Sequence, residues 1–317
     1  MKKVMLNSRK KEDFAKKIQR MNKYRALLLM MLPMVVVQIL NGYLPLFGLT
    51  IAFKDVDYSK GLLGSDWIGL KNFEFMFASS DIWRIMANTI VYNLIFIILG
   101  TAMAVALAIM LNEIRCRFMA KVYQTLLILP YFLSMVVVSY IVYAFLSPQY
   151  GFIPEIFSNL GLPEIDWYSE PDLWRPLLIG IKMWSTVGYN SIIYLATLAG
   201  MDTSLFEAAM IDGASKRQQI RYITLPMLKT VITVTMILSL GGIIKGDFGL
   251  FYQVPMNSPQ LYPATDVIDT YVYRSLTQLG DIGMSSAVGF VQSVVGCVLV
   301  IASNKIVQFI DRDQAIF

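Results

Sequence analysis

Few residues in this 317-residue sequence could carry out chemistry. The sequence has no histidine, its carboxylates fall outside the long apolar segments, and no G-x-x-x-x-G-K-[ST] motif is present to hold nucleotide phosphates. Polar residues inside apolar segments are costly and by default mark a path for polar cargo. The candidates are Lys182, Trp184, Tyr189 and Asn190 in one segment, Asn93 in another, Gln38 and Asn41 in a third, and Lys245, Asp247, Tyr252 and Gln253 beyond a fourth.

These candidates combine aromatic rings with amide and ammonium groups, which suits a carbohydrate. Sugar hydroxyls need hydrogen-bond partners, and the apolar face of a sugar ring stacks on aromatic side chains. Helical spacing lets at most three of the four candidates in 182–190 face one cavity. Lys182 has no evident partner and would favour an anionic sugar, whereas Lys245 and Asp247 are expected to neutralise each other. The alternative is packing between helices or, for Lys182, an ammonium reaching outward to the membrane interface.

The composition indicates a membrane protein. Hydrophobic residues make up 56% of the sequence and charged residues only 15%, whereas a soluble domain has about 25% charged residues. A helix needs roughly 20 apolar residues to cross a bilayer. We therefore predict an all-α protein with a basic leader at 1–25 and one membrane domain at 26–317, crossing the bilayer at about 26–53, 88–111, 122–147, 176–200, 223–244 and 283–307.

The segments between these predicted helices are not expected to form a second domain. Short surface helices are expected at 54–87, and an ordered, turn-rich cap at 148–175. The segment 245–282 is predicted as an outer loop, and its first part at 245–263 is a candidate gate or receptor contact. The leader has a weak apolar period that suits a helix lying on anionic membrane lipid, although a solvated basic anchor explains it equally well.

Basic residues predict the orientation in the membrane. Ten of the 27 Lys and Arg residues precede Ala26, which places the N-terminus in the cytoplasm by the positive-inside rule. The loops at 112–121 and 201–222 are then cytoplasmic and are basic, as the rule requires. Because the positive charge follows membrane sidedness, a nucleic-acid partner is not expected. The sequence predicts a multi-pass membrane protein.

The most polar stretch between two apolar segments is EAAMIDGASKRQQIRYITLP at 207–226. A capping box at 204–207 predicts a helix that begins at Ser204, and Gly213 supplies the left-handed residue that ends it. A second box at 215–218 predicts another short helix toward Tyr222. Pro226 then suits the first turn of the fifth membrane helix.

The first of these two helices exposes small and apolar residues to the cytosol. Ala208 to Ile211 are less polar than a helix surrounded by water normally is, which indicates a docking partner. The alternative is that Glu207 serves only as a cap and that the alanines are only good helix formers.

The spacing of this stretch resembles the EAA loop of ABC importer permeases. The flanking sequences MWSTVGYNSIIYLATLAGMD, DVIDTYVYRSL and SSAVGFVQSVVGCVLVIASNKIV are similar to LplB-type carbohydrate permeases, so the resemblance covers about 25–317. The residues that match the EAA pattern are Glu207, Ala208, Ala209, Asp212, Gly213, Ala214, Ile223, Leu225 and Pro226.

The resemblance implies a type I ABC importer permease fold, with coupling helices between the fourth and fifth crossings. In that family these helices dock in a cleft of the ATPase subunit; Glu207 would be the polar contact and Gly213 the elbow, while Ala208 and Ala209 would permit close approach. It also implies a second homologous permease, two ATPase subunits that hold ATP and magnesium, an extracytoplasmic solute-binding protein and a carbohydrate substrate. This chain itself would need no cofactor, would bind no metal, and would have no catalytic residues.

Two other classes of protein fit less well. An ion-coupled secondary transporter or channel needs acidic residues or histidine inside the membrane, and the six predicted crossings have none. An intramembrane enzyme needs a nucleophile with a base or paired carboxylates, which are likewise missing from those segments. Cys116 and Cys297 are predicted to be too far apart for a disulfide.

Overall fold

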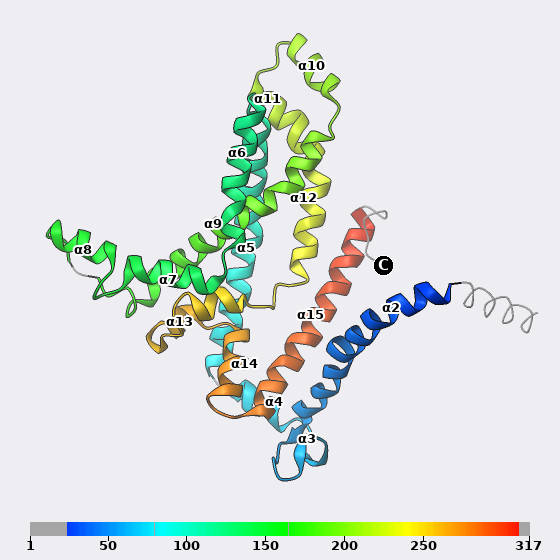
Figure 1. Ribbon diagram of the computed structural model, residues 1–317, viewed down its shortest axis with the longest axis vertical. Coiled ribbons are helices and arrows are strands. Elements are labelled where there is room, and N and C mark those ends of the chain that lie inside the picture. Colours follow the sequence, from blue (N-terminus) through cyan, green and yellow to red (C-terminus); the bar gives the residue numbers. More distant parts are fainter. Residues whose placement is uncertain (1–23, 79, 164, 311–317) are drawn as a thin grey trace, which may run out of the picture.

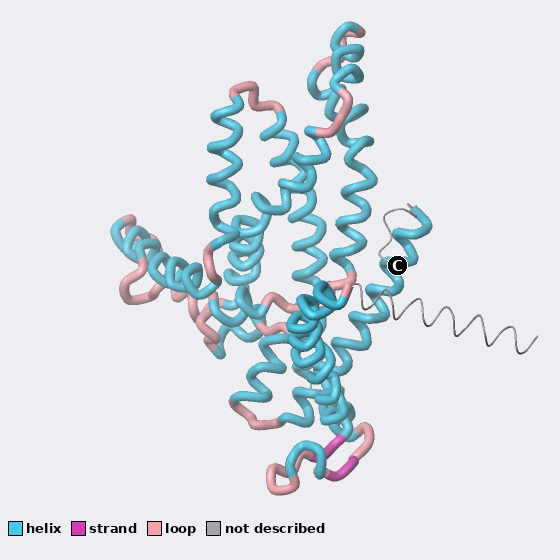
Figure 2. The backbone as a smooth tube through the Cα atoms, turned by 45° about the vertical axis from the view of Figure 1, so that its right-hand side comes forward, coloured by secondary structure: helices cyan, strands magenta, loops and turns pink. Residues whose placement is uncertain are grey.

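The computed structural model describes residues 24–78, 80–163 and 165–310. Most of the predicted leader lies outside these residues. The regular secondary structure of the described part is helical apart from one short antiparallel pair of strands, in which Lys54 pairs with Trp67. Helix α10 lies at one end of the long axis, and the two strands lie at the opposite end (Figures 1 and 2).

The first predicted crossing is a continuous helical segment over Arg25–Phe53. It changes character along its length, from α2 (Arg25–Gln38) through the π-helical η1 (Ile39–Tyr43) to the 3₁₀-helical η2 (Leu44–Phe53). No side chain of α2 is buried within the chain, so its apolar surface is free to contact lipid or another subunit.

Two long helices form the centre of the bundle. They are α5 (Ser80–Asn112) and α9 (Pro171–Ala199), which pack along each other. An apolar residue of α12 (Leu225–Leu240) joins them in a buried cluster that contains Leu228 together with Ala104 and Leu198. Figure 1 shows that α6 (Arg117–Ile128) runs beside α5 on another side.

The third predicted crossing is not one straight helix. After α6, the short η3 (Leu129–Phe132) leads into α7 (Met135–Leu146), and the two parts are bent by 95°. Pro130 lies at the bend, and the Ser134 side chain then caps α7 by accepting a hydrogen bond from the Val137 N–H at 3.3 Å. The segment predicted as one crossing at 122–147 is therefore two helices joined by a bend.

Close approach of α9 holds this bend in place. A Cβ atom at Gly188 would lie 1.9 Å from the backbone oxygen of Leu127, so only glycine fits there. Beside it, the rings of Tyr131 and Tyr189 stack with their centres 4.0 Å apart. The bend thus depends on a tertiary contact as well as on Pro130.

Short elements cover the end of the bundle opposite α10. The 54–87 region contains the expected short surface helices and also the two strands, which the sequence analysis did not predict. The elements of this end are β1 (Lys54–Asp55), α3 (Gly61–Gly64), β2 (Asp66–Trp67), α4 (Lys71–Ala78), η5 (Gly249–Gln253), η6 (Pro259–Leu261), α13 (Tyr262–Thr265) and α14 (Ile268–Thr277). Helix α8 (Phe152–Asn159) follows α7. Helix α15 (Ile282–Ile310) runs back along the bundle.

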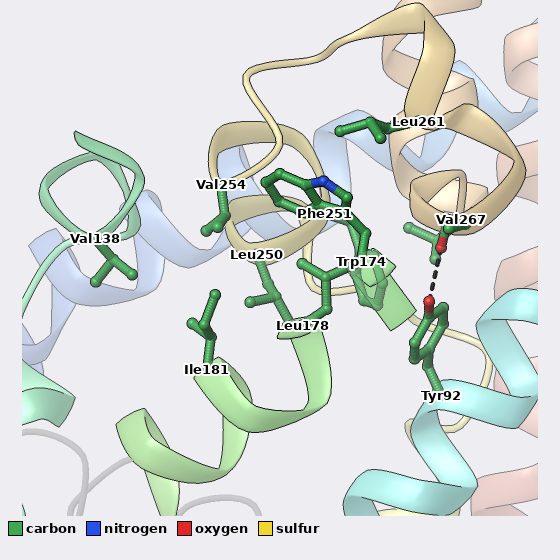
Figure 3. Packing of buried hydrophobic residues seen from close by; sticks show 11 residues of the cluster. Tyr92, Val138, Trp174, Leu178, Ile181, Leu250, Phe251, Val254, Leu261 and Val267 are labelled. Atoms are coloured by element: carbon green, nitrogen blue, oxygen red, sulfur yellow. Dashed lines mark hydrogen bonds between the residues drawn. The ribbon is translucent and has the colours of Figure 1, made fainter. Parts of the chain in front are cut away.

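The largest buried cluster joins this end to the central helices. Leu250 and Phe251 of η5, with Val254 directly after it, pack over Leu178 and Ile181 of α9 (Figure 3). In the same cluster the Tyr92 hydroxyl donates a hydrogen bond to the Ala264 carbonyl at 2.8 Å, which ties α5 to α13.

Four described helical segments are long and apolar enough to cross a membrane, and the bent pair of α6 and α7 would make a fifth. The helix predicted as the fourth crossing, α9, is 29 residues long but is not apolar enough to be counted with them. The count of six crossings stays a prediction. The four segments are Arg25–Phe53, Asp81–Asn112, Lys216–Leu240 and Ile282–Gln308.

Candidate functional site

The polar stretch of the sequence begins with α10 (Thr203–Ile211), and its cap differs from the prediction. Asp202 caps the helix by accepting a hydrogen bond from the Ser204 N–H at 2.9 Å, so the predicted capping box at 204–207 is wrong. Aspartate is as good an N-cap as serine, and its charge is favourable at the positive end of a helix. The bond to the Ser204 backbone N–H lowers the pKa of Asp202, because it stabilises the ionised carboxylate.

The end of α10 is built as the sequence predicts. Gly213 has a φ of +77°, a conformation that other residues adopt only with strain. The Ala214 N–H donates to the Ala209 carbonyl at 2.9 Å, and the Gly213 N–H donates to the Met210 carbonyl at 3.1 Å. This pair of bonds is a Schellman motif, which turns the chain sharply at the end of a helix.

The second short helix is confirmed, but it does not stop near Tyr222. The capping box of Ser215 and Gln218 opens α11 (Lys216–Gln219), and η4 (Ile220–Thr224) joins it to α12 without a break. Together they form one 25-residue helical segment. Pro226 lies in the first turn of α12, where its missing N–H costs little. Helix α11 is therefore continuous with one of the candidate membrane segments.

Helix α10 projects from the end of the bundle (Figure 1), and none of its residues is buried. Ile211 is 87% exposed and Met210 is 54% exposed. Among the residues that match the EAA pattern, Glu207, Ala208, Asp212, Gly213, Leu225 and Pro226 are exposed, and Ala209, Ala214 and Ile223 are half-buried.

An open groove of about 400 Å³ lies between α10 and the first turns of the helical segment Lys216–Leu240. Leu205 lines it from α10, and residues at the start of the membrane segment line its other side: Tyr222, Ile223, Pro226 and Met227. Lys216 also forms an ion pair with Glu113 at 3.0 Å, which ties α11 to the end of α5. The unit is thus anchored on one side and apolar and open on the other.

A second candidate site is a cavity of about 640 Å³ between α5, α9 and α12. Lys182, Tyr189 and Asn190 line it, whereas Trp184 does not and is half exposed elsewhere on α9. Three of the four candidates on this helix therefore share the cavity, in agreement with their spacing.

Several polar lining residues were missing from the sequence analysis. Thr186 is four residues from both Lys182 and Asn190, so the helical period places it on their stripe. Thr235 and Ser239 contribute hydroxyl groups from α12, and Phe96 contributes a ring from α5. A search for threonine and serine at helical spacing from Lys182 would have found Thr186.

Other candidates lie away from the cavity lining. The Asn93 amide donates to the carbonyls of Thr89, Ile243 and Lys245 at 2.8–2.9 Å, so it joins α5 to the chain after α12. Asn41 bonds to the Val37 carbonyl of its own helical segment.

Residues 248–253 contribute to an aromatic group beside α14. Tyr252 stacks on Phe248 and meets Tyr273 edge to face, while Gln253 lies half-buried at the end of η5.

The charges near the cavity pair differently from the prediction. Lys182 Nζ lies 2.6 Å from Asp247 Oδ2, so Lys182 has a partner and Asp247 does not pair with Lys245. Residues two apart in the chain point in different directions, whereas the fold brings Asp247 over the side of α9 that carries Lys182.

The chain belongs to the family described as the binding-protein-dependent transport system inner membrane component, whose model matches residues 96–312. It is therefore a multi-pass membrane component of an importer, as distinct from the subunit that hydrolyses ATP.

Among its relatives is the polygalacturonan/rhamnogalacturonan transport system permease protein YteP of Bacillus subtilis (strain 168), 34% identical over 297 residues that cover 94% of this chain and 92% of that protein. Protein LplB of the same organism is 31% identical over 287 residues, covering 90% of each chain. A similar solved structure is a bacterial ABC transporter involved in the import of the acidic polysaccharide alginate, with a TM-score of 0.83, 31% identity, and coverage of 92% of this chain and 98% of that one.

Proposed function

We propose that this chain is the permease subunit of an ABC importer in a prokaryotic plasma membrane, and that α10 and α11 are its coupling helices. The observation that carries the proposal is a projecting helix with no buried residue and with Met210 and Ile211 exposed at its end. Apolar side chains of this size in water indicate a surface that another protein covers. The Gly213 turn and the continuous helix over Lys216–Leu240 supply the elbow and the lever.

The proposed orientation places α10 in the cytosol. The basic residues of its loop and of the N-terminal leader support this side. Six crossings follow if α9 crosses as the fourth helix and the bent pair of α6 and α7 together make the third. Both ends of the chain are then cytoplasmic, and the strands and α14 face outward.

The proposed assembly contains a second homologous permease, two ATPase subunits and an extracytoplasmic solute-binding protein. The family description and a structure similar to this chain support it; that structure is the alginate ABC transporter in complex with a periplasmic protein bound to alginate pentasaccharide, with 31% identity and a TM-score of 0.81. ATP and magnesium would bind to the ATPase, because this sequence has no phosphate-binding motif.

The proposed cargo is an oligosaccharide, and the cavity between α5, α9 and α12 is part of its path. The cavity offers a tyrosine ring, the Asn190 amide and several hydroxyl groups, which is the combination that sugars bind. The relatives named for polygalacturonan and alginate favour an acidic glycan. Tyr252 and Gln253 are proposed as part of the outer gate, and Asn93 as a structural tie behind the path.

The coupling role can be tested by copurification of the ATPase. We expect Ile211→Asp to reduce the ATPase bound per permease by about tenfold, because a carboxylate in an apolar socket loses its hydration. The matched control is Leu160→Asp, which makes the same change at a 68% exposed residue after α8, away from α10. Equal ATPase recovery with the two variants would contradict the coupling role of α10.

A further inference from the structure

The ion pair at the cavity joins two parts of the chain that lie far apart in the sequence. Lys182 lies in α9, and Asp247 lies in the segment between α12 and η5, 65 residues away. Their side chains are 22% and 28% exposed, so water reaches both groups but screens them only in part. The pair therefore holds the segment after α12 against the side of α9 that lines the cavity.

Lys182 has donor capacity that this pair does not use. A lysine ammonium carries three N–H donors, and Asp247 is its one hydrogen-bond partner among the described residues. The same ammonium lies 5.8 Å from the centre of the Phe96 ring, which also lines the cavity. The Asn190 amide follows two turns along the same stripe and has no side-chain hydrogen bond within the described part of the chain.

Asp247 also positions η5. Its Oδ2 accepts from Lys182, while its Oδ1 accepts a hydrogen bond from the Leu250 N–H at 3.1 Å. Leu250 and Phe251 pack over α9 in the buried cluster (Figure 3). One carboxylate thus fixes both the cavity lysine and the element that covers the outer end of α9.

We propose that Lys182 is a carboxylate-binding subsite for an acidic oligosaccharide, and that Asp247 occupies it when no cargo is present. A uronate carboxylate entering the cavity replaces Asp247 on the Lys182 ammonium. Asp247 is then released to water, and the segment that leads to η5 loses its ion pair to α9 while the apolar contacts of Leu250 and Phe251 remain. This inference rests on the proposed importer function and adds to it the charge of the cargo and the residue that selects it.

The exchange selects an anionic cargo because it keeps Lys182 paired with a carboxylate. A uronate leaves Lys182 neutralised, because one carboxylate takes the place of another. A neutral sugar that displaced Asp247 would leave an unpaired ammonium in a partly buried cavity, which is costly. The same pair therefore attracts an anionic cargo and resists a neutral one, and such combined selection is a common source of specificity.

The test uses the complete importer, with its ATPase and binding protein, in proteoliposomes. Uptake is measured for trisaccharides of galacturonate and of alginate, each as the free acid and as the uncharged methyl ester. The variants are Lys182→Met, Asp247→Asn and the double substitution. Lys71→Met, on the exposed α4, is the matched control. The sugar preference of the binding protein is the same in all samples, so it cancels when the uptake by each variant is divided by the uptake by the wild type.

We expect Lys182→Met to lower uptake of the free acids about tenfold more than uptake of the esters. Asp247→Asn should raise ATP hydrolysis without cargo, because the Asp247 side chain no longer ties its segment to Lys182. Lys71→Met should change neither the ratio of acid uptake to ester uptake nor the rate of ATP hydrolysis without cargo.

The inference is overturned if Lys182→Met lowers uptake of acids and esters by the same factor, or if the double substitution restores acid uptake to the wild-type level. Either result would show that the ion pair of Lys182 and Asp247 serves only to hold the structure together. The inference is also overturned if the wild-type importer takes up the esters and not the acids, a result that would leave the importer function intact. Uptake of neither form would contradict the proposed cargo itself.

Discussion

Two glycines show how a single residue sets geometry in two different ways. Gly213 is needed for its backbone conformation, because φ is +77° and a Cβ atom there would meet nothing within 4 Å. Gly188 is needed for space, because a Cβ atom there would overlap the backbone of Leu127. The first shapes the projecting unit, and the second lets α6 lie against α9. A substitution at each site should therefore fail in a different measurement.

Gly213→Ala should weaken coupling without unfolding the membrane domain. Forcing alanine into the left-handed region costs roughly 1–2 kcal/mol and favours unwinding the Schellman turn. We expect the copurified ATPase to fall severalfold while the melting temperature of the detergent-solubilised permease changes little. Gly213→Asn should recover part of the loss, because asparagine tolerates this conformation.

Gly200→Ala is the matched control, because Gly200 ends α9 with a φ of −91° and a Cβ atom there would find contacts no closer than 3.6 Å. A similar loss of ATPase in Gly200→Ala would show that the conformation of Gly213 is not the cause.

At the scale of elements, local patterns were readable and long-range contacts were not. The capping box at Ser215 and the glycine turn at Gly213 lie within a few residues of sequence, and both were predicted correctly. The bend after α6 was missed, because an apolar run gives the same pattern whether it is straight or folded back on a glycine of another helix. The pairing of Lys182 with Asp247 was also missed, since no local pattern connects residues 65 positions apart.

The bend predicts a stability difference between two glycines of one helix. Gly188→Ala should destabilise the permease by about 1–3 kcal/mol, because α6 and α9 must separate to admit a methyl group. Gly180→Ala, on the same helix, places its methyl group in open space and should be neutral or slightly stabilising. Thermal unfolding of the two variants in detergent measures the difference. Equal melting temperatures would mean that α6 and α9 are not in close contact.

The whole molecule has two ends with different characters. One end carries α10, the α11 arm and the ion pair to Glu113, and the other carries the strands, α14 and the cluster over α9. The cavity lies between α5, α9 and α12, which connect these ends. Work received at α10 would pass through α12 to the helices that line the cavity. The account therefore depends on α10 being a cytosolic element in contact with an ATPase.

Site-specific cross-linking of α10 tests this claim most directly. Cys116 and Cys297 are replaced by serine, and a single cysteine is introduced as Ile211→Cys or, at an 85% exposed position of the outer cap, as Tyr150→Cys. In spheroplasts, a membrane-impermeant maleimide should label Tyr150→Cys and leave Ile211→Cys unlabelled. In inverted vesicles, a photoreactive maleimide on Ile211→Cys should yield an adduct with the ATPase subunit. Labelling of Ile211→Cys from outside the cell, or the same yield of ATPase adduct from both cysteines, would contradict the account.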